Sequence, residues 1–249
     1  MDTTYRGNGG NGVMATFTGP SAAASNGLVM AFDAANPKSY PGSGSTWFDI
    51  SGNGNDMTLF NQAFNSDGGG NIYFNGSSTY GDLGSDFTLS NSAASVSTWA
   101  KVINFTSLSS GKSQQARSLI YRSDLQFYSL IAFWNGGYGW ESMTNGSPYE
   151  VNTTNTAPIS APAIAPNLWF NFVLTFDGNI ARSYVNGQFI TSITNTTTLQ
   201  YRYLGRASFN ANYPDYMYGN IGNFMVYDRA LSAEEIETSF HSYRIRYGL

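Results

Sequence analysis

The chain has 249 residues, of which 41% are hydrophobic, 16% aromatic and 11% charged, and its formal net charge is −4. Its 12 lysines and arginines form no basic cluster, so we expect no nucleic-acid partner. The absence of cysteine excludes disulfides, thiolate metal sites and cysteine nucleophiles. No segment reaches the ~18 consecutive apolar residues of a membrane span, so we expect no membrane insertion.

Residues 1–26 are rich in glycine, asparagine, alanine and serine and contain few apolar positions. Burying so little apolar surface would not offset the entropy lost when the segment becomes ordered. We therefore expect residues 1–26 to form an arm or linker and residues 27–249 to form one domain. The opening segment also lacks the basic start and continuous apolar stretch of a secretory signal, so we expect no export signal.

Short apolar or alternating runs recur from residue 28 onward. The clearest is 168–177, LWFNFVLTFD, in which the aromatic and aliphatic positions from Phe170 to Phe176 share one face. A period of two predicts a strand with one face in the core. Asn186-Gly187 then predicts a type I′ hairpin, because both residues tolerate positive φ. Similar runs lie at 28–33, 71–74, 95–105, 117–122, 127–134 and 217–227, and Asn-Gly recurs at 26, 53, 75, 135 and 145.

These runs together predict an all-β protein, an antiparallel sandwich of about a dozen strands. One short helix is predicted near the end, within residues 230–249. Ser232 is placed to cap its first turn and Glu235 to reach back, which is a capping box. Arg244 and Arg246 follow, where they would complement the negative end of the helix dipole. The apolar stripe that would pack on the sandwich consists of Ile236, Phe240 and Tyr243.

Residues 49–56, DISGNGND, have two interpretations. A calcium loop of the EF-hand type needs a bidentate glutamate at its twelfth position, and that position is Phe60. A polar turn, with Asx hydrogen bonds and glycines at positive φ, accounts for every residue type present. We predict the turn, and a calcium site in which Asp49 or Asn55 joins distant acids is the alternative.

Two aromatic groups are suited to stacking on sugar rings while neighbouring amides bind hydroxyls. The alternative for both groups is that the rings pack in the core, as large aromatic side chains more often do. The first group, in FWNGGYGWE, comprises Trp134, Tyr138 and Trp140, and the second, in FNANYPDYMYGN, comprises Tyr213, Tyr216 and Tyr218.

Catalysis finds less support in the sequence. A glycoside hydrolase needs two carboxylates about 5–9 Å apart. Glu141 and Glu150 would face opposite sides of one unbroken strand, although Asn145 and Gly146 favour a turn between them. His241, the only histidine, lies in the predicted helix and cannot hold zinc alone, so a surface or half-buried position is expected. We predict a non-enzymatic protein and keep a carboxylate-pair glycosidase as an alternative.

Five stretches of the sequence follow one another between residues 27 and 236: GLVMAFDAANPKSYPGSGSTWFDISGNGND, IYFNGSSTYGDLG, SVSTWAKV, WFNFVLTFDGNIARSYVNGQFI and YLGRASFNANYPDYMYGNIGNFMVYDRALSAEEI. Together they resemble a laminin G-like domain of the concanavalin A-like lectin/glucanase superfamily. The resemblance implies a jelly-roll β-sandwich of two antiparallel sheets and a glycan- or protein-binding role, often with a bound calcium ion.

The resemblance also extends to individual residues. Asp33, Asp49 and Asp228 match positions where the family tends to have acids at loop ends, which adds them to Asn55 as candidate calcium ligands. The Glu-x-Asp-x-x-Glu strand of the superfamily's glucanases is absent from this sequence, so their activity is not implied.

AFDAANPKSYPGSGSTW and the tail RIRYGL further resemble versions of this domain in structural proteins of tailed bacteriophages. This resemblance implies a virion protein, such as a capsid decoration, head fibre or tail appendage, that is assembled in the host cytoplasm. Its arm would bind other virion proteins and its sandwich would bind host cell-surface glycans, as a single chain or a homo-oligomer. A bacterial carbohydrate-binding module is the alternative.

Overall fold

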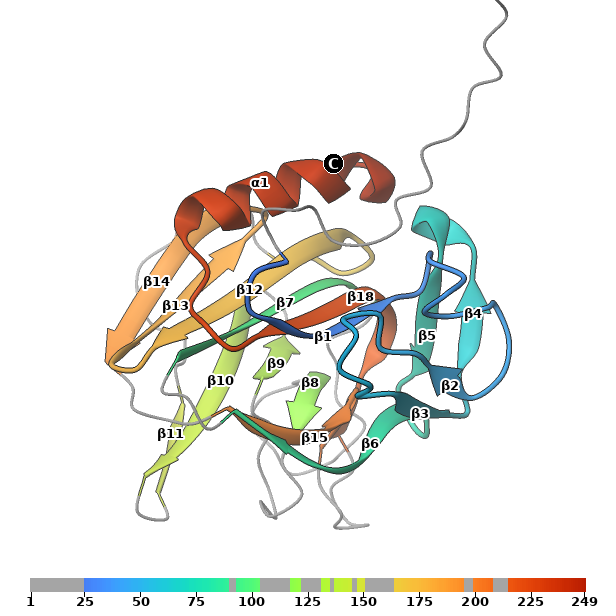
Figure 1. Cartoon of the computed structure of the whole chain (residues 1–249), viewed down its shortest axis with the longest axis horizontal. Coiled ribbons are helices and arrows are strands. Elements are labelled where there is room, and N and C mark those ends of the chain that lie inside the picture. Colours follow the sequence, from blue (N-terminus) through green and yellow to red (C-terminus); the bar gives the residue numbers. More distant parts are fainter. Residues whose placement is uncertain are drawn as a thin grey trace, which may run out of the picture.

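The computed structural model describes residues 25–89, 93–103, 117–121, 131–134, 137–144, 147–150, 164–194, 199–207 and 215–249. These residues form two eight-stranded antiparallel sheets, a two-stranded ribbon and one α-helix. The helix lies across the top of the molecule in Figure 1. The predicted antiparallel sandwich with a C-terminal helix is confirmed. No described helix is long and apolar enough to cross a bilayer. The predicted arm lies outside the described residues except for its last two positions.

The first sheet lies next to the helix. Its strands are β1 (Leu28–Asp33), β4 (Ala63–Asn65), β5 (Asn71–Asn75), β7 (Ala93–Val102), β12 (Trp169–Asp177), β13 (Ile180–Val185), β14 (Gln188–Thr194) and β18 (Tyr218–Tyr227). The strand order is β14-β13-β12-β7-β18-β5-β4. One edge of β18 pairs along its length with β7, and the other pairs first with β5 and then with β1.

The second sheet lies on the side away from the helix. Its strands are β2 (Thr46–Trp47), β3 (Met57–Phe60), β6 (Tyr80–Thr88), β8 (Arg117–Tyr121), β9 (Ile131–Trp134), β10 (Gly137–Thr144), β11 (Ser147–Glu150) and β15 (Gln200–Leu204), in the order β11-β10-β9-β8-β15-β6-β3-β2. The ribbon pairs β16 (Arg206–Ala207) with β17 (Asp215–Tyr216). The described residues thus contain eighteen strands, more than the predicted dozen, because several have only two to four residues and show no periodicity.

The main core fills the space between the two sheets. Phe224 of the first sheet packs edge-to-face on Tyr201 of the second, with ring centroids 5.9 Å apart. Phe32 packs on Trp47 across the sandwich with tilted rings, whose centroids are 5.4 Å apart. All four side chains are fully buried, and burial of each contributes roughly 1.5–3 kcal/mol. These buried aromatic side chains therefore help to hold the two sheets together.

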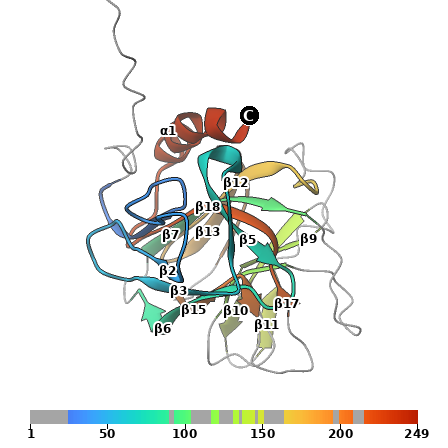
Figure 2. The same ribbon diagram turned by 90° about the vertical axis from the view of Figure 1, so that its right-hand side faces the viewer.

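A second apolar layer covers the other face of the first sheet, where α1 (Ala233–Tyr243) and the 3₁₀ helix η4 (Arg244–Tyr247) pack, as Figure 2 shows from the side. The prediction that only one face of 168–177 would be buried is wrong. Phe170 and Phe172 of β12 face the main core, while Trp169 and Val173 are buried beneath the helices. The fold is consequently three layers deep at β12, because helix, first sheet and second sheet lie on one another.

Helix α1 begins as predicted. The Ser232 hydroxyl accepts a hydrogen bond from the Glu235 N–H, and the Glu235 carboxylate accepts one from the Ser232 N–H. The predicted stripe faces inward, since Ile236 and Tyr243 are buried and Phe240 stacks on Trp99 with ring planes 9° apart. His241 is exposed on the opposite side, as expected.

Glu235 also joins the helix to the end of β18. Arg229 donates to both of its carboxylate oxygens, at 2.8 and 2.5 Å. This pair, together with the capping hydrogen bond from Ser232, lowers the pKa of Glu235 from 4.5 to about 2 against the opposing effect of burial. A folded-state pKa below the unfolded value means that Glu235 stabilises the protein above about pH 4.5.

We expect this stabilisation to disappear as the pH falls from about 4.5 toward 2, because the Glu235 carboxylate then becomes protonated. Thermal unfolding measured across this range should show a steeper loss of stability for the wild type than for Glu235→Gln. Glu237→Gln, an exposed position on the same helix, is the matched control and should follow the wild type. Parallel wild-type and Glu235→Gln curves would contradict the assignment.

The C-terminal segment, residues 244–249, makes contacts that were not predicted from the sequence, and Arg244 and Arg246 lie beyond the end of α1. The Arg246 guanidinium lies 2.8 Å from Asp33 Oδ1 and donates to the carbonyl oxygens of Gly68 and Gly70, so its partners lie on other elements rather than on α1. Tyr247 stacks on Trp99, with centroids 4.3 Å apart. The segment therefore fastens the helical layer to the first sheet.

Candidate functional site

The loop at residues 49–56 is organised around the Asp49 carboxylate. Its Oδ1 accepts hydrogen bonds from the N–H groups of Ala31 and Ser51, both at 2.9 Å. Its Oδ2 accepts from the Ser51 hydroxyl at 2.8 Å and from the Asn55 N–H at 3.0 Å. Both glycines of the loop have positive φ, 94° and 75°. The predicted polar turn is confirmed, with Asp49 as its central acceptor.

The four candidate calcium ligands are spread along β1. The Asp228 N–H donates to the carbonyl oxygen of Gly27, just before β1 begins. Asp33 is the last residue of β1. At roughly 3.3 Å per residue these two acids lie about 20 Å apart. Asp49 and Asn55 lie beside the middle of the strand. No group of three acidic or histidine side chains suited to a metal occurs in the described part of the chain, and the calcium site stays a prediction.

The first aromatic group lies on β9 and β10, which pair with each other, and the predicted Asn-Gly turn between them lies outside the described residues. Trp134 is the register partner of Gly137, which precedes Tyr138 in β10. The side chains of Trp134, Tyr138 and Trp140 lie outside those that the structure describes, and their role in sugar binding stays a prediction.

The second aromatic group also divides. Tyr213 lies outside the described residues. Tyr218 packs edge-to-face on Tyr73, with centroids 6.4 Å apart, beside the first sheet. Tyr216 instead joins a cluster on the second sheet, where its ring centroid lies 6.5 Å from that of Tyr80. Only Tyr216 of the predicted sugar-binding residues is placed in an aromatic cluster by the described side chains.

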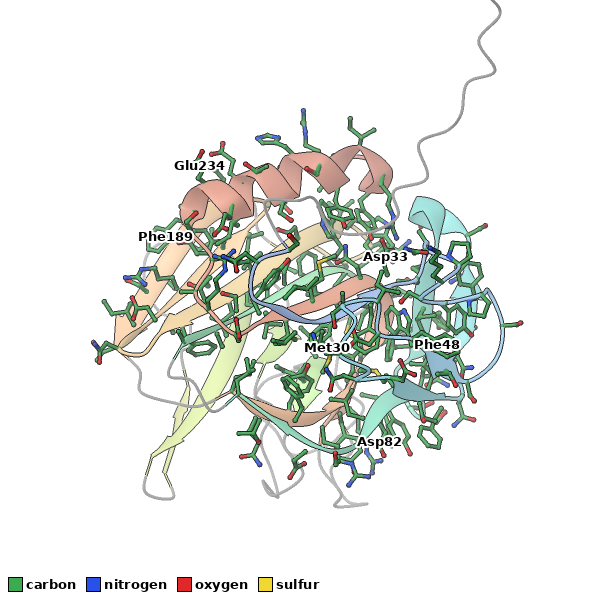
Figure 3. All side chains as sticks on the ribbon, in the orientation of Figure 1. Met30, Asp33, Phe48, Asp82, Phe189 and Glu234 are labelled. Carbon is green, nitrogen blue, oxygen red and sulfur yellow. The ribbon has the colours of Figure 1, made fainter. Side chains whose placement is uncertain are left out.

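That cluster covers part of the outer face of the second sheet, the face turned away from the main core. We call it the aromatic platform. It consists of Phe60, Tyr80, Asp82, Arg202, Tyr203, Arg206 and Tyr216. Figure 3 shows Asp82 at the bottom of the molecule, opposite Glu234 of α1. The platform and the helical layer therefore lie on opposite sides of the sandwich.

Strand register brings the platform together. Phe60 is the direct cross-strand partner of Tyr80, and their rings stack nearly parallel with centroids 4.6 Å apart. Tyr203 is the partner of Asp82, next to an irregularity in β15 that separates it from the core residue Tyr201. Cross-strand pairs of this kind are neighbours on one face of a sheet. Phe60, at the edge of the group, remains 38% exposed.

Two arginines are built into the platform. Arg202 forms a forked pair with Asp82, from Nε to Oδ1 at 2.7 Å and from an Nη atom to Oδ2 at 3.1 Å. Arg206 lies 4.7 Å from the Tyr80 centroid and 5.5 and 5.9 Å from those of Tyr203 and Tyr216. Such distances allow cation–π attraction to all three rings.

The charges of the platform fix the ionisation of Asp82. Burial acts to raise its pKa, but hydrogen bonds from Arg202 and Gly84 and the charges of Arg202 and Arg206 together lower it. Asp82 is thus an anion at neutral pH, held within reach of two cations. The platform therefore combines a partly exposed ring, Phe60, with a paired carboxylate and guanidinium, groups of the kind that exchange hydrogen bonds with hydroxyls.

Residues 75–237 match a laminin G profile described as the Concanavalin A-like lectin/glucanases superfamily. The chain belongs to this family. The profile spans more than half of the sequence, and the two-sheet sandwich agrees with it. No curated protein matches the chain.

Solved structures of similar fold come from several proteins. Domain 4 of AbnA, a GH43 extracellular arabinanase from Geobacillus stearothermophilus solved with arabinotriose, has a TM-score of 0.60 and 19% identity over 85% of this chain and 97% of its own. The binding domain of Paraclostridial Mosquitocidal Protein 1 has the same score and identity over 88% of this chain and 53% of its own. The binding domain of botulinum neurotoxin serotype D has a TM-score of 0.61 and 14% identity, over 88% and 52%.

The chain spans about half the length of both toxin binding domains but nearly all of the arabinanase domain. At these identities the likeness establishes a common fold. It does not extend to the ligands of those proteins.

Proposed function

We propose that this protein is a non-enzymatic carbohydrate-binding domain whose ligand stacks on the aromatic platform. The observation that carries the proposal is the parallel stack of Phe60 on Tyr80, at the exposed edge of the platform. A flat ring complements the apolar C–H face of a sugar, while Arg202 and Asp82 supply groups that bind hydroxyls. The structure of the AbnA domain with arabinotriose supports the proposal as an example of a sugar complex on this fold.

The arrangement of the layers also supports a binding site on the second sheet. The outer face of the first sheet is covered by α1 and η4, which bury Trp99 and Trp169. The corresponding face of the second sheet carries the platform. Within the platform Tyr203 is buried, at 2% exposed, so Phe60 is the ring that would meet a ligand.

Replacing Phe60 with alanine is expected to weaken sugar binding roughly tenfold, equivalent to about 1.4 kcal/mol, because the exposed stacking surface is lost. A panel of oligosaccharides titrated by calorimetry or NMR measures this change. Phe189→Ala is the matched control, since Phe189 is 55% exposed but lies on β14 of the other sheet. Equal affinities of the wild type and Phe60→Ala would contradict the proposed site.

The non-enzymatic part of the proposal has its own test. The hairpin of β10 and β11 makes Glu141 and Glu150 register partners at the edge of the second sheet, as the turn between them favoured. The glycosidase alternative rests on this pair. We expect no release of reducing ends from polysaccharides. Hydrolysis by the wild type that Glu141→Gln abolishes would establish the enzyme instead.

The finer part of the proposal is that the domain belongs to a tailed-bacteriophage virion, as a capsid decoration, head fibre or tail appendage assembled in the host cytoplasm. Its support is the sequence resemblance of AFDAANPKSYPGSGSTW and RIRYGL. Residues 1–26 would then attach the domain to other virion proteins, and the platform would bind host glycans.

Mass spectrometry of purified particles tests this finer part. Finding the chain in virions supports it, as does the loss of incorporation when residues 1–26 are removed. Finding the chain in bacterial culture fluid and in no particle would favour the alternative, a secreted carbohydrate-binding module.

A further inference from the structure

The charges of the aromatic platform balance one another. Arg202 is neutralised by its forked pair with Asp82, and Asp86 on the same strand also lies in its electrostatic field. Arg206 is the second cation of the platform. Two arginines thus meet two aspartates among the described residues of this face, which gives it no net positive charge.

Neither arginine is arranged as an open anion receptor. The fork of Arg202 already binds a carboxylate in the bidentate geometry by which arginine recognises anions. Arg206 lies over or beside three tyrosine rings, whose faces carry negative electrostatic potential. An incoming carboxylate would have to compete with Asp82 or approach those rings.

The net charge of the whole protein also disfavours an acidic ligand. The formal net charge is −4, and the sequence pI is about 4.8. At neutral pH the molecule therefore repels an acidic ligand at long range, most strongly at low ionic strength. A neutral ligand meets no such barrier, and its apolar face gains the same contact with Phe60.

We propose that the platform selects neutral saccharides over saccharides that carry a carboxylate. This inference rests on the proposed function, because it specifies the ligand class of the same site. Structures of similar fold have been solved with both kinds of ligand, since the AbnA domain was solved with arabinotriose and the botulinum neurotoxin DC binding domain with SialylT. The charge balance around Asp82 assigns this protein to the neutral class.

The test is a panel of neutral oligosaccharides, including arabinotriose and lactose, each titrated beside a sialylated or uronic-acid counterpart at low ionic strength. We expect each neutral sugar that binds to bind at least about fivefold more tightly than its acidic counterpart, because like charges repel. Acidic counterparts that bind equally well or better would overturn this inference and leave the carbohydrate-binding proposal standing. A panel without any binding would overturn both.

A charge variant tests the cause. Asp82→Asn leaves Arg202 without its counter-ion, so affinity for the acidic sugar should rise relative to the neutral one by roughly three- to tenfold. Asp177→Asn is the matched control, because it removes the partner of Arg182 at 2.6 Å in the other sheet and should leave the ratio unchanged. An unchanged ratio in a folded Asp82→Asn protein would overturn the inference.

Arg202→Gln provides an independent reading in case Asp82→Asn fails to fold. It leaves Asp82 without its paired cation, and discrimination against the acidic sugar should increase. Melting curves establish that each variant is folded before its affinities are compared. Weaker discrimination in folded Arg202→Gln would contradict the proposed charge balance.

Discussion

Replacing Tyr247 with alanine is expected to destabilise the protein by about 3–5 kcal/mol, the cost of removing a large buried aromatic side chain. The ring lies 4.3 Å from Trp99 and 4.7 Å from Trp169, measured between centroids, and the residue is 5% exposed. Its loss would leave a cavity between η4 and the first sheet. Urea unfolding, followed by tryptophan fluorescence, measures the free energy of unfolding.

Tyr247→Phe is the informative control. The Tyr247 hydroxyl is buried and makes no hydrogen bond to any described residue, so it carries a desolvation cost without a compensating partner. Burial also raises its pKa well above the usual value. Removing the hydroxyl should leave stability unchanged or raise it by about 1 kcal/mol. A Tyr247→Phe protein as unstable as Tyr247→Ala would show that the ring stack is not the source of the stability.

Asp49→Ala is expected to destabilise the protein by about 2–4 kcal/mol, because charged hydrogen bonds are lost and buried donors remain unpaired. The Asp49 carboxylate accepts four hydrogen bonds, including one from the Ala31 N–H in the middle of β1. Asp56→Ala is the matched control, since among the described residues the exposed Asp56 accepts one hydrogen bond, from the Asp49 N–H. Equal unfolding free energies for the two variants would contradict the central role of Asp49.

Calcium titration separates the two interpretations of this loop. If the Asp49 carboxylate serves the loop's own donors, adding calcium leaves the melting temperature of the wild type unchanged. A rise in melting temperature that Asp49→Ala abolishes would instead establish the calcium site that the family resemblance implies. Bound ligands stabilise the native state in this way because they bind it in preference to the unfolded chain.

The features predicted well from the sequence are those decided by neighbouring residues. The capping box of Ser232 and Glu235 needs only three residues of separation. Asn186 and Gly187 have φ of 51° and 77°, the two positive values of the predicted hairpin turn. At 53–54 and 75–76 only the glycine has positive φ, so Asn-Gly alone does not specify this turn. Local sequence determined these conformations because local contacts form them.

The candidate site was largely missed, because it is assembled by strand order and register. Arg202 and Asp82 are 120 residues apart, and Phe60 meets Tyr80 across two strands. No local pattern reports which strands become neighbours. The solvent-facing position of Phe60 in an alternating strand was the available signal. Tyr216 was predicted from its segment, in which aromatic residues lie beside polar ones. Such a composition does not show which residues become neighbours in the fold.

The contact between Arg229 and Asn26 has a consequence for orientation. Arg229 donates to the Asn26 carbonyl oxygen at 2.8 Å while it pairs with Glu235 of α1. The backbone that leads into β1 is thus fixed at the start of the helix, on the side of the sandwich opposite the aromatic platform (Figure 1). A partner protein attached through that backbone would lie on the side of the helical layer, and the stack of Phe60 and Tyr80 would lie on the far side. Under the proposed function, the attachment point and the sugar-binding site would then lie on opposite sides of the domain.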